Sequence, residues 1–574
     1  MQTPAQVLLE NGVRGLRDGL HETGELYDVV FQEPTQYGTA YFAYANAVLA
    51  RLVSGEERRA YLDVAERGVA ATVRHLLDLH DERPPVTRYY PAVGSPSVAN
   101  LRDFMWPPVL RTLRLLKEIG ETAEAGLSTL AEQVASIPVP ETFNKRGPVN
   151  WASVWMLGEW MRVRAGLSPH TQESFDAWLV PFFEGSLDVG RGVYFEPGLP
   201  NSYDLFTRVH LLDLLVEGYR GAFFEDLDRL VESGLRRSLA LQLSSGSLAS
   251  AHRSTGHLWV LGAQCAYFFN AARYLRERAP ELATAAERAA VRSFDAARGL
   301  FRANGELSPV ENVFPADHRI GYEVYTADSH YVSLPLGFFA TAVLDGFTGD
   351  GPVEIDVEPV ALVDPAPINR ALLHADRWSL HLNFDPQPGY MAPEPRYDAL
   401  GIADLTLGPG RRLRFGGQVR HVGTATPLTV GLGIWQPDGS LVPLSTMRPS
   451  TGPIVRTFGR TMEGKVRVVE LIYRITAEIL KDELRVIEDV GEYPVSLLVP
   501  YLRDYGTGTT TVALDRTGLV LQKAGETVEV RPEGAVRRVV HLPHGYESRH
   551  GLVGLVRFDL DATGPVAYRV RRVR

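Results

Sequence analysis

The stretch Gly349-Asp350-Gly351-Pro352 divides the sequence into two halves with different patterns. Two glycines and a proline within four residues interrupt regular secondary structure, so this stretch is a predicted linker. Residues 1–350, before it, contain segments with helical periodicity, whereas residues 351–574, after it, contain short segments typical of strands. We therefore expect two domains in the order α then β.

The first half is predicted to be built from about twelve helices. One apolar stripe with three- and four-residue spacing is formed by Leu62, Ala65, Val69, Val73 and Leu76. Many successive helices joined by short loops form either an open solenoid or a closed toroid of paired helices. The absence of a fixed-period repeat in the sequence favours the toroid. Residues 1–350 are therefore predicted to be an (α/α) toroid that carries the catalytic residues.

The second half alternates short β-rich segments with turn signals. Examples of such segments are Trp378–Phe384, Leu428–Trp435 and Val536–Leu542, and Pro437-Asp438-Gly439 is one of the turns. Short strands separated in this way usually pair antiparallel and pack as two layers. Residues 351–574 are therefore predicted to form an antiparallel β-sandwich domain.

The composition disfavours several classes of function. The chain has 574 residues, of which 45% are hydrophobic and 22% charged, as in ordinary soluble proteins. Its formal net charge of -10 disfavours nucleic acid and anionic membranes as partners. The single cysteine, Cys265, allows neither an internal disulfide nor a thiolate zinc site, and no cofactor is expected. Met1–Gln6 shows no signal-peptide pattern, so we expect a cytoplasmic protein, while the oligomeric state stays open.

Asn150-Trp151 is the first of several polar clusters at the ends of predicted helices. Asn150 has two interpretations, because its amide can cap a helix or can hydrogen-bond a substrate carboxylate. Trp151 is a candidate substrate-binding residue, since an indole ring stacks well on the apolar face of a sugar.

The second cluster contains Tyr203, Asp204, His210 and Tyr219. Tyr203 and His210 are seven residues apart and therefore share one helix face. Phenol and imidazole groups transfer protons, so Tyr203, His210 and Tyr219 are candidate catalytic residues. A structural role for a single helical histidine is an equally good interpretation. Asp204 is a candidate substrate-binding residue.

Two further clusters lie between predicted helices. His252 and Arg253 belong to the first, where the Arg253 guanidinium is suited to holding a carboxylate with two parallel hydrogen bonds. Asp328, His330 and Tyr331 form the second, although Asp328 is equally suited to capping the helix that follows. His252, Asp328, His330 and Tyr331 are assigned to substrate binding and Arg253 to catalysis.

Taken together, the layout resembles polysaccharide lyases of the chondroitin AC, hyaluronate and xanthan lyase type, and also heparinase II/III-like proteins. The resemblance rests on Asn150-Trp151, then His210, then Tyr219 nine residues later in a glycine-flanked turn, then Arg253. It implies a toroid followed by β-sandwiches and cleavage of uronate-containing glycans by β-elimination. It also implies that Asn150 neutralises the uronate carboxylate and that Tyr219, assisted by His210 and Arg253, moves the proton.

Three alternatives stay open at this stage. Tyr203 competes with Tyr219 for the proton-transfer role. A glycoside hydrolase on the same toroid would need two carboxylates, for which the candidates are Glu196, Asp204, Glu323 and Asp328. Glu196 is also a candidate substrate-binding residue in the lyase interpretation. A glycan-binding protein without catalytic activity would keep the aromatic residues and show no turnover.

Overall fold

The computed structural model describes most of the chain. The described residues are 2–78, 101–143, 149–195, 201–249, 254–323, 326–353, 357–386, 399–408, 414–415, 417–421, 424–523 and 525–573. Within them, no helix is long and apolar enough to cross a membrane.

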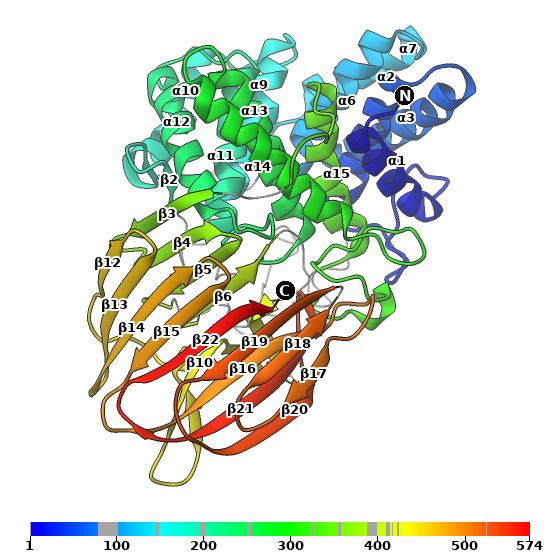
Figure 1. Cartoon of the computed structure of the whole chain (residues 1–574). Helices are drawn as coiled ribbons and strands as arrows, with labels where there is room; N and C mark the ends of the chain where they lie inside the picture. Colours follow the sequence, from blue (N-terminus) through cyan, green and yellow to red (C-terminus); the bar gives the residue numbers. More distant parts are fainter. Residues whose placement is uncertain are drawn as a thin grey trace.

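The helical half is built on a closed ring of inner helices (Figure 1). These are α2 (Gly38–Leu52), α6 (Arg102–Ile119), α9 (Asn150–Arg164), α11 (Asn201–Val216), α13 (Leu258–Leu275) and α15 (Asp328–Leu344). Each inner helix contacts the next one along the chain, and α15 contacts α2, which closes the ring. The predicted toroid is therefore confirmed and the open solenoid is not formed.

Outer helices alternate with the inner ones along the chain. They are α1 (Pro4–Leu16), α3 (Gly55–Leu77), α7 (Glu124–Ser136), α10 (Gln172–Gly185), α12 (Phe224–Leu241) and α14 (Pro280–Arg298), with the short α8 (Val139–Thr142). Sequence pattern explains the two layers. Outer α12 buries one stripe that includes Leu227, Leu230 and Leu235, whereas inner α13 is buried on nearly all sides. An amphipathic helix needs one packing partner, and an apolar helix must be surrounded.

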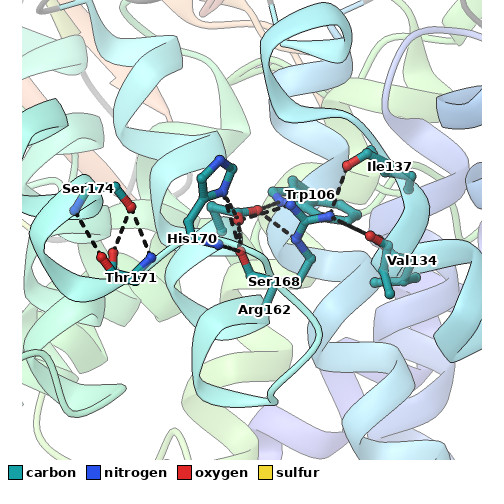
Figure 2. Close-up of polar contacts among 10 residues, drawn as sticks. Trp106, Val134, Ile137, Arg162, Ser168, His170, Thr171 and Ser174 are labelled. Atoms are coloured by element: carbon teal, nitrogen blue, oxygen red, sulfur yellow. Dashed lines mark hydrogen bonds and ion pairs between the residues drawn. The ribbon is translucent and has the colours of Figure 1, made fainter.

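A buried ion pair fastens outer helix α7 to the ring (Figure 2). Arg162 of α9 donates to the carbonyl oxygens of Val134 and Ile137, which lie at the end of α7, over 3.1 and 2.9 Å. The carboxylate of Glu159, one turn earlier, pairs with Arg162 at 2.9 Å and accepts from Trp106 Nε1 at 3.2 Å. Because both charges are fully buried, their mutual pairing is required for either to be tolerated.

The second half consists of antiparallel sheets (Figure 1). A five-stranded sheet contains β3 (Val357–Asp364), β4 (Arg370–Asp376), β5 (Trp378–Asn383), β6 (Gly401–Leu407) and β7 (Arg414–Phe415). An eight-stranded sheet contains β12 (Ile454–Phe458), β13 (Thr461–Val468), β14 (Leu471–Leu480), β15 (Glu483–Asp489), β17 (Thr511–Leu514), β18 (Leu519–Lys523), β19 (Glu526–Pro532) and β22 (Val566–Val573). A seven-stranded sheet contains β8 (Gly417–His421), β9 (Thr424–Leu428), β10 (Gly431–Trp435), β11 (Leu441–Pro443), β16 (Pro494–Asp504), β20 (Val536–Ser548) and β21 (Gly551–Thr563).

The five-stranded sheet is the layer between the helices and the other strands. Ala371 and Leu373 of β4 belong to the apolar core of the β region, whereas Leu372 between them belongs to the helical core. The order α then β is confirmed. The predicted boundary at residues 350–351 falls between the end of α15 at Leu344 and the start of β3 at Val357.

Candidate active site

Aromatic side chains from the first turns of the inner helices meet at one end of the ring. We call this group the aromatic cluster, and its members are Tyr37, Phe104, Trp151, Tyr203, Phe206, Trp259, His330 and Tyr331. The ring of Phe104 stacks on Tyr37 at 4.9 Å and on Phe206 at 5.4 Å, and Trp151 meets Phe104 edge-on at 6.0 Å. All members except Trp151 are buried, and Trp151 is partly exposed. Aromatic rings of this kind can stack on a sugar ring.

Half of the residues in this cluster were predicted from the sequence as site residues. Trp151, Tyr203, His330 and Tyr331 were predicted, and the structure brings all four to the same end of the ring. The other four are Tyr37, Phe104, Phe206 and Trp259. Aromatic residues in apolar helices are usually core residues, so only the position shared by these four, at the start of successive inner helices, could have indicated a site.

Tyr203 is the one predicted catalytic tyrosine that belongs to the aromatic cluster. It lies in the first turn of α11, its ring is 5.8 Å from that of Trp259, and 8% of the residue is exposed. Its hydroxyl is hydrogen-bonded to the hydroxyl of Ser254 at 2.9 Å. Ser254 has a φ of 65°, a left-handed conformation that a serine adopts only when its surroundings enforce it. The loop thus places this hydroxyl on Tyr203.

Asn150 opens α9 at the same end of the ring. It is 2% exposed, and Trp151 next to it contacts Phe104. The N-cap position is occupied by Val149, whose backbone is extended, so Asn150 is the first helical residue and does not act as the cap. The capping interpretation of Asn150 is therefore wrong for this helix.

His210 lies deeper in the ring than the aromatic cluster. Its ring is 4.5 Å from Phe206, and its Nδ1 is 2.6 Å from the Phe206 carbonyl oxygen one turn earlier. A carbonyl oxygen accepts only, so Nδ1 carries the hydrogen. Burial lowers the pKa of His210 to about 3, and the imidazole is therefore neutral at pH 7. Its ring also packs against Phe338 of α15 at 6.0 Å, so it lies among apolar rings inside the toroid.

Tyr219 lies beyond the opposite end of α11. The thirteen-residue advance from Tyr203 to Val216 corresponds to about 20 Å along a helix. The Tyr219 hydroxyl donates to the carboxylate of Asp176 on α10, and its ring packs edge-on against Trp160 at 5.3 Å. Burial, and then this hydrogen bond, raise the pKa of Tyr219 above its usual range. The structure therefore does not bring Tyr219 together with Tyr203 and Asn150.

Asp204 and Asp328 each form an ion pair with an arginine. Asp204 accepts from Nε and Nη2 of Arg208 at 2.8 and 2.9 Å. Asp328 accepts from Arg302 Nη1 at 2.6 Å and from the Tyr322 hydroxyl at 2.5 Å. Ala327 holds the N-cap position of α15, so the expected capping role of Asp328 is wrong. Both carboxylates lie near the aromatic cluster and hold the starts of α11 and α15 in place.

The opposite side of the aromatic cluster is joined to the β region. Tyr331 is 4.9 Å from the ring of His257, whose Nε2 lies 3.8 Å from the carboxylate of Glu323. Arg549, in the turn between β20 and β21, pairs with Glu323 and donates to the carbonyl oxygen of Thr255 over 2.6 Å. The turn therefore packs on the loop that carries Ser254. Sequence analysis did not single out Arg549, because nothing local marks a turn that reaches another domain.

Three predicted residues, Glu196, His252 and Arg253, lie outside the described residues. Their roles stay predictions.

The electrostatics of this end favour a negative ligand. The inner helices all present their first turns to the aromatic cluster, and a helix N-terminus carries about half a positive charge on its free amide hydrogens. Several such ends around one surface attract carboxylate, sulfate or a developing enolate.

Comparison with solved structures gives the fold. Chondroitin AC lyase of Streptomyces coelicolor A3 matches over 99% of this chain and 79% of that chain. A point mutant of that lyase superposes with a TM-score of 0.54 at 11% identity, and its complex with chondroitin sulphate with 0.51 at 12%. This chain has the fold of a toroid polysaccharide lyase. The resemblance read from the sequence is therefore confirmed at the level of the fold.

A second solved structure matches a smaller part of this chain. An α-1,6-mannanase of Salegentibacter sp. HEL1_6 matches over 59% of this chain and 99% of that chain, with a TM-score of 0.40 and 11% identity. No family model matches the sequence, and no curated protein matches it either. Identities of 11 and 12% establish the fold and leave the reaction to be argued from the residues of this chain.

Proposed function

We propose that the protein is a carbohydrate-active enzyme that cleaves uronate-containing oligosaccharides by β-elimination at the aromatic cluster. The observation that carries this proposal is the position of Tyr203. It is a buried phenol, 8% exposed and hydrogen-bonded to Ser254, among aromatic rings at the N-terminal ends of the inner helices. Of the two tyrosines considered, only Tyr203 can meet a sugar that is stacked on those rings.

In the proposed reaction, Tyr203 transfers one proton in two steps. As a phenolate it takes the proton from the carbon next to the uronate carboxylate, and negative charge spreads onto that carboxylate. The bond between the neighbouring carbon and the glycosidic oxygen then breaks, and the phenol returns its proton to the leaving oxygen. The Ser254 hydroxyl stabilises the phenolate by hydrogen bonding, while Asn150 and the helix N-termini stabilise the charged carboxylate.

The carboxylates support elimination over hydrolysis. A glycosidase needs one protonated carboxyl group as acid. Asp204, Asp328 and Glu323 each form a buried ion pair with an arginine, so their oxygens are engaged in structural contacts. None of these three is therefore suited to be the acid, whereas a tyrosine does not need a carboxyl partner.

A hydrolase is the second candidate, because of Asp28. This buried carboxyl lies beside the start of α15, where it accepts from the Ser329 amide at 2.9 Å. Burial, and then the charge of Asp328, raise the pKa of Asp28. A carboxyl group with a raised pKa near an ionised one is the pattern expected of a general acid and its partner.

One experiment separates the two reactions. Defined uronate-containing oligosaccharides are incubated with the protein in ¹⁸O-labelled water, and the products are analysed by mass spectrometry and near-ultraviolet absorbance. Elimination gives unlabelled products with a conjugated double bond, and Tyr203→Phe abolishes them. Labelled, non-absorbing products that vanish in Asp28→Asn would instead establish hydrolysis. Retained binding with no turnover of any glycan would reduce the protein to a glycan-binding role.

A further inference from the structure

A polar face of the five-stranded sheet is turned toward the helices. In the antiparallel pairing of β4 with β5, Leu372 stands opposite His381 and Arg370 stands opposite Asn383. Cross-strand partners, and residues two apart on a strand, share one face of a sheet. Leu372 packs in the helical core, so the side chains of Arg370 and His381 lie on the face next to the helices.

Helix α12 and the loop after it supply hydrogen-bond partners to the polar groups on one part of this face. Asp364 accepts hydrogen bonds from Nη1 and Nη2 of Arg237 at 2.6 and 2.8 Å. His374 Nε2 is 2.7 Å from the Ala240 carbonyl oxygen, and Ser379 accepts from the Ser244 amide at 2.7 Å. Polar groups on this part of the interface thus have partners, as buried polar groups normally do.

Arg370 and His381 differ from these neighbours. Arg370 Nε donates to Asp364 at 2.6 Å, but Nη1 and Nη2 have no hydrogen-bond partner among the described residues. Both ring nitrogens of His381 also lack a described partner, although the two residues are only 3% and 1% exposed. Burying charged donors without acceptors costs several kcal/mol, so such an arrangement is expected where a ligand supplies the acceptor.

The ion-pair group beside His381 carries an excess positive charge. Arg237 and Arg370 share one carboxylate, Asp364, so this group by itself has a net charge of +1, while the carboxylate of Asp404 lies on the other side of His381. Burial lowers the pKa of Arg370 to about 10, so the guanidinium stays charged at pH 7. Burial and the adjacent charge of Arg370 lower the pKa of His381 to about 3, so its imidazole is a neutral donor.

This part of the sheet lies next to the candidate active site. Asp204, which follows Tyr203 in α11, pairs with Arg208, and Arg208 donates to the hydroxyl of Ser238, which follows Arg237 on α12. Asp404 of β6 stands opposite His381, and its carboxylate would repel an anion there. An anion is therefore expected on the side of the imidazole that faces Arg370.

We propose that Arg370 and His381 form an anion-binding subsite for a carboxylate or sulfate group of the glycan, while the aromatic cluster holds a neighbouring sugar. The two Nη groups of Arg370 donate to the anion, and one ring N–H of His381 donates a further hydrogen bond. This inference rests on the proposed function for the identity of the ligand. It assigns to the sheet a share in recognising acidic substrates.

Thermal unfolding of the full chain tests the subsite without any need for catalysis. The probes are sodium glucuronate, sodium sulfate, sodium chloride at matched ionic strength, and glucose. We expect glucuronate, sulfate or both to raise the Tm in a saturable way, and chloride and glucose not to do so. The anion that acts identifies the group that the subsite takes.

Matched variants locate the effect. Arg370→Met should abolish the saturable rise, and His381→Phe should weaken the affinity about tenfold. Arg237→Met is the control, since it removes an arginine of the same ion-pair group whose Nη1 and Nη2 both bind Asp364. It should lower the starting Tm and keep the rise. A rise that persists in Arg370→Met, or no saturable rise at all, would overturn the subsite and leave a water-filled gap as the explanation.

Crystals of the wild-type protein test the anion-binding subsite if Arg370→Met does not fold. After a selenate soak, an anomalous selenium peak within hydrogen-bonding distance of Arg370 Nη supports the subsite, and its absence at saturating selenate contradicts it. Turnover is scored separately. Arg370-dependent binding of glucuronate without turnover would remove the proposed reaction and keep the subsite, whereas β-elimination without such binding would do the reverse.

Discussion

The two ends of the inner helix ring use buried polar groups in different ways. At the N-terminal end, Tyr203 and Asn150 lie among aromatic rings and loops that lead to the β region. At the C-terminal end, Tyr219 is bound by Asp176, and Arg111 of α6 pairs with Asp213 of α11 at 2.5 Å. The first end holds Tyr203 and Asn150, which are proposed to meet a ligand, beside the structural ion pairs of Asp204 and Asp328. At the second end the polar groups hold helices together.

Single helices repeat this division. Along α9, Asn150 and Trp151 stand at the aromatic cluster, whereas Glu159 and Arg162 further on form the ion pair that holds α7. Along α11 the same change separates Tyr203 from Tyr219. Position along the helix, and not residue type, therefore separates the residues of the proposed site from those that form structural contacts. Substitutions at the first end should change activity, and those at the second should change stability.

The largest expected effect separates Tyr203, at the start of α11, from Tyr219, beyond the end of α11. Tyr203→Phe should lower kcat on uronate oligosaccharides by on the order of 10³-fold, about 4 kcal/mol, because it removes the proton carrier. Tyr219→Phe should leave kcat within about threefold and lower the unfolding free energy by about 1–2 kcal/mol, because Asp176 loses its donor. Steady-state kinetics and urea unfolding on both variants provide the measurements. The reverse pattern would return the proton-transfer role to Tyr219.

The second effect concerns the ion pair at the far end of α9. Glu159→Ala should lower the unfolding free energy by about 3–4 kcal/mol, since Arg162 is left as a buried unpaired charge. The folded fraction should keep its kcat. Glu232→Ala is the control, because its pair with Arg236 is solvent-exposed and should contribute less than about 1 kcal/mol. Equal losses in the two variants, measured by urea unfolding, would show that the Glu159 network does not hold the ring.

The third prediction tests whether water is excluded from the interior of the ring around His210. Its pKa is about 3 in the folded chain and about 6.5 when unfolded, so between these values the unfolded state binds more protons. Stability from His210 is complete above pH 6.5 and is lost as pH falls toward 3, by about 1.4 kcal/mol per unit.

Urea unfolding of wild type and His210→Gln at pH 7.5, 5.5 and 4.5 measures this loss. The advantage of wild type over the variant should shrink by about 2–3 kcal/mol between pH 7.5 and 4.5. Parallel profiles would mean that His210 titrates normally, and it would then be open to the active site as the sequence resemblance implied.

The smallest effect concerns the sugar-stacking surface. Trp151→Ala should raise KM about tenfold and change kcat little, because it removes stacking area in the ground state and the transition state alike. Trp178→Ala is the matched control. Trp178 is also partly buried, but it packs on Trp155 and His170 in the outer layer. A similar KM for the two variants would remove the aromatic cluster from substrate binding.

Local patterns explain which elements could be predicted. The stripe of Leu62, Ala65 and Val69 follows the helical period, and burial of that stripe in α3 confirms it. The sequence pattern did not predict strand β4, because this part of the sheet is covered on both faces. Arg370 and His374 face the helices where an alternating pattern would place apolar residues, and every residue from Arg370 to Ala375 is buried. Alternation is visible only when one face meets water.

The sequence by itself determined that a helical half precedes a β half, because periodicity and turn residues act over a few positions. It also placed Trp151, Tyr203, His330 and Tyr331 among the candidates. Only the tertiary structure decided that these four meet at one end of the ring and that Tyr219 does not join them. Closure of the ring and contact with the sheet depend on residues hundreds of positions apart, and no local spacing encodes such contacts.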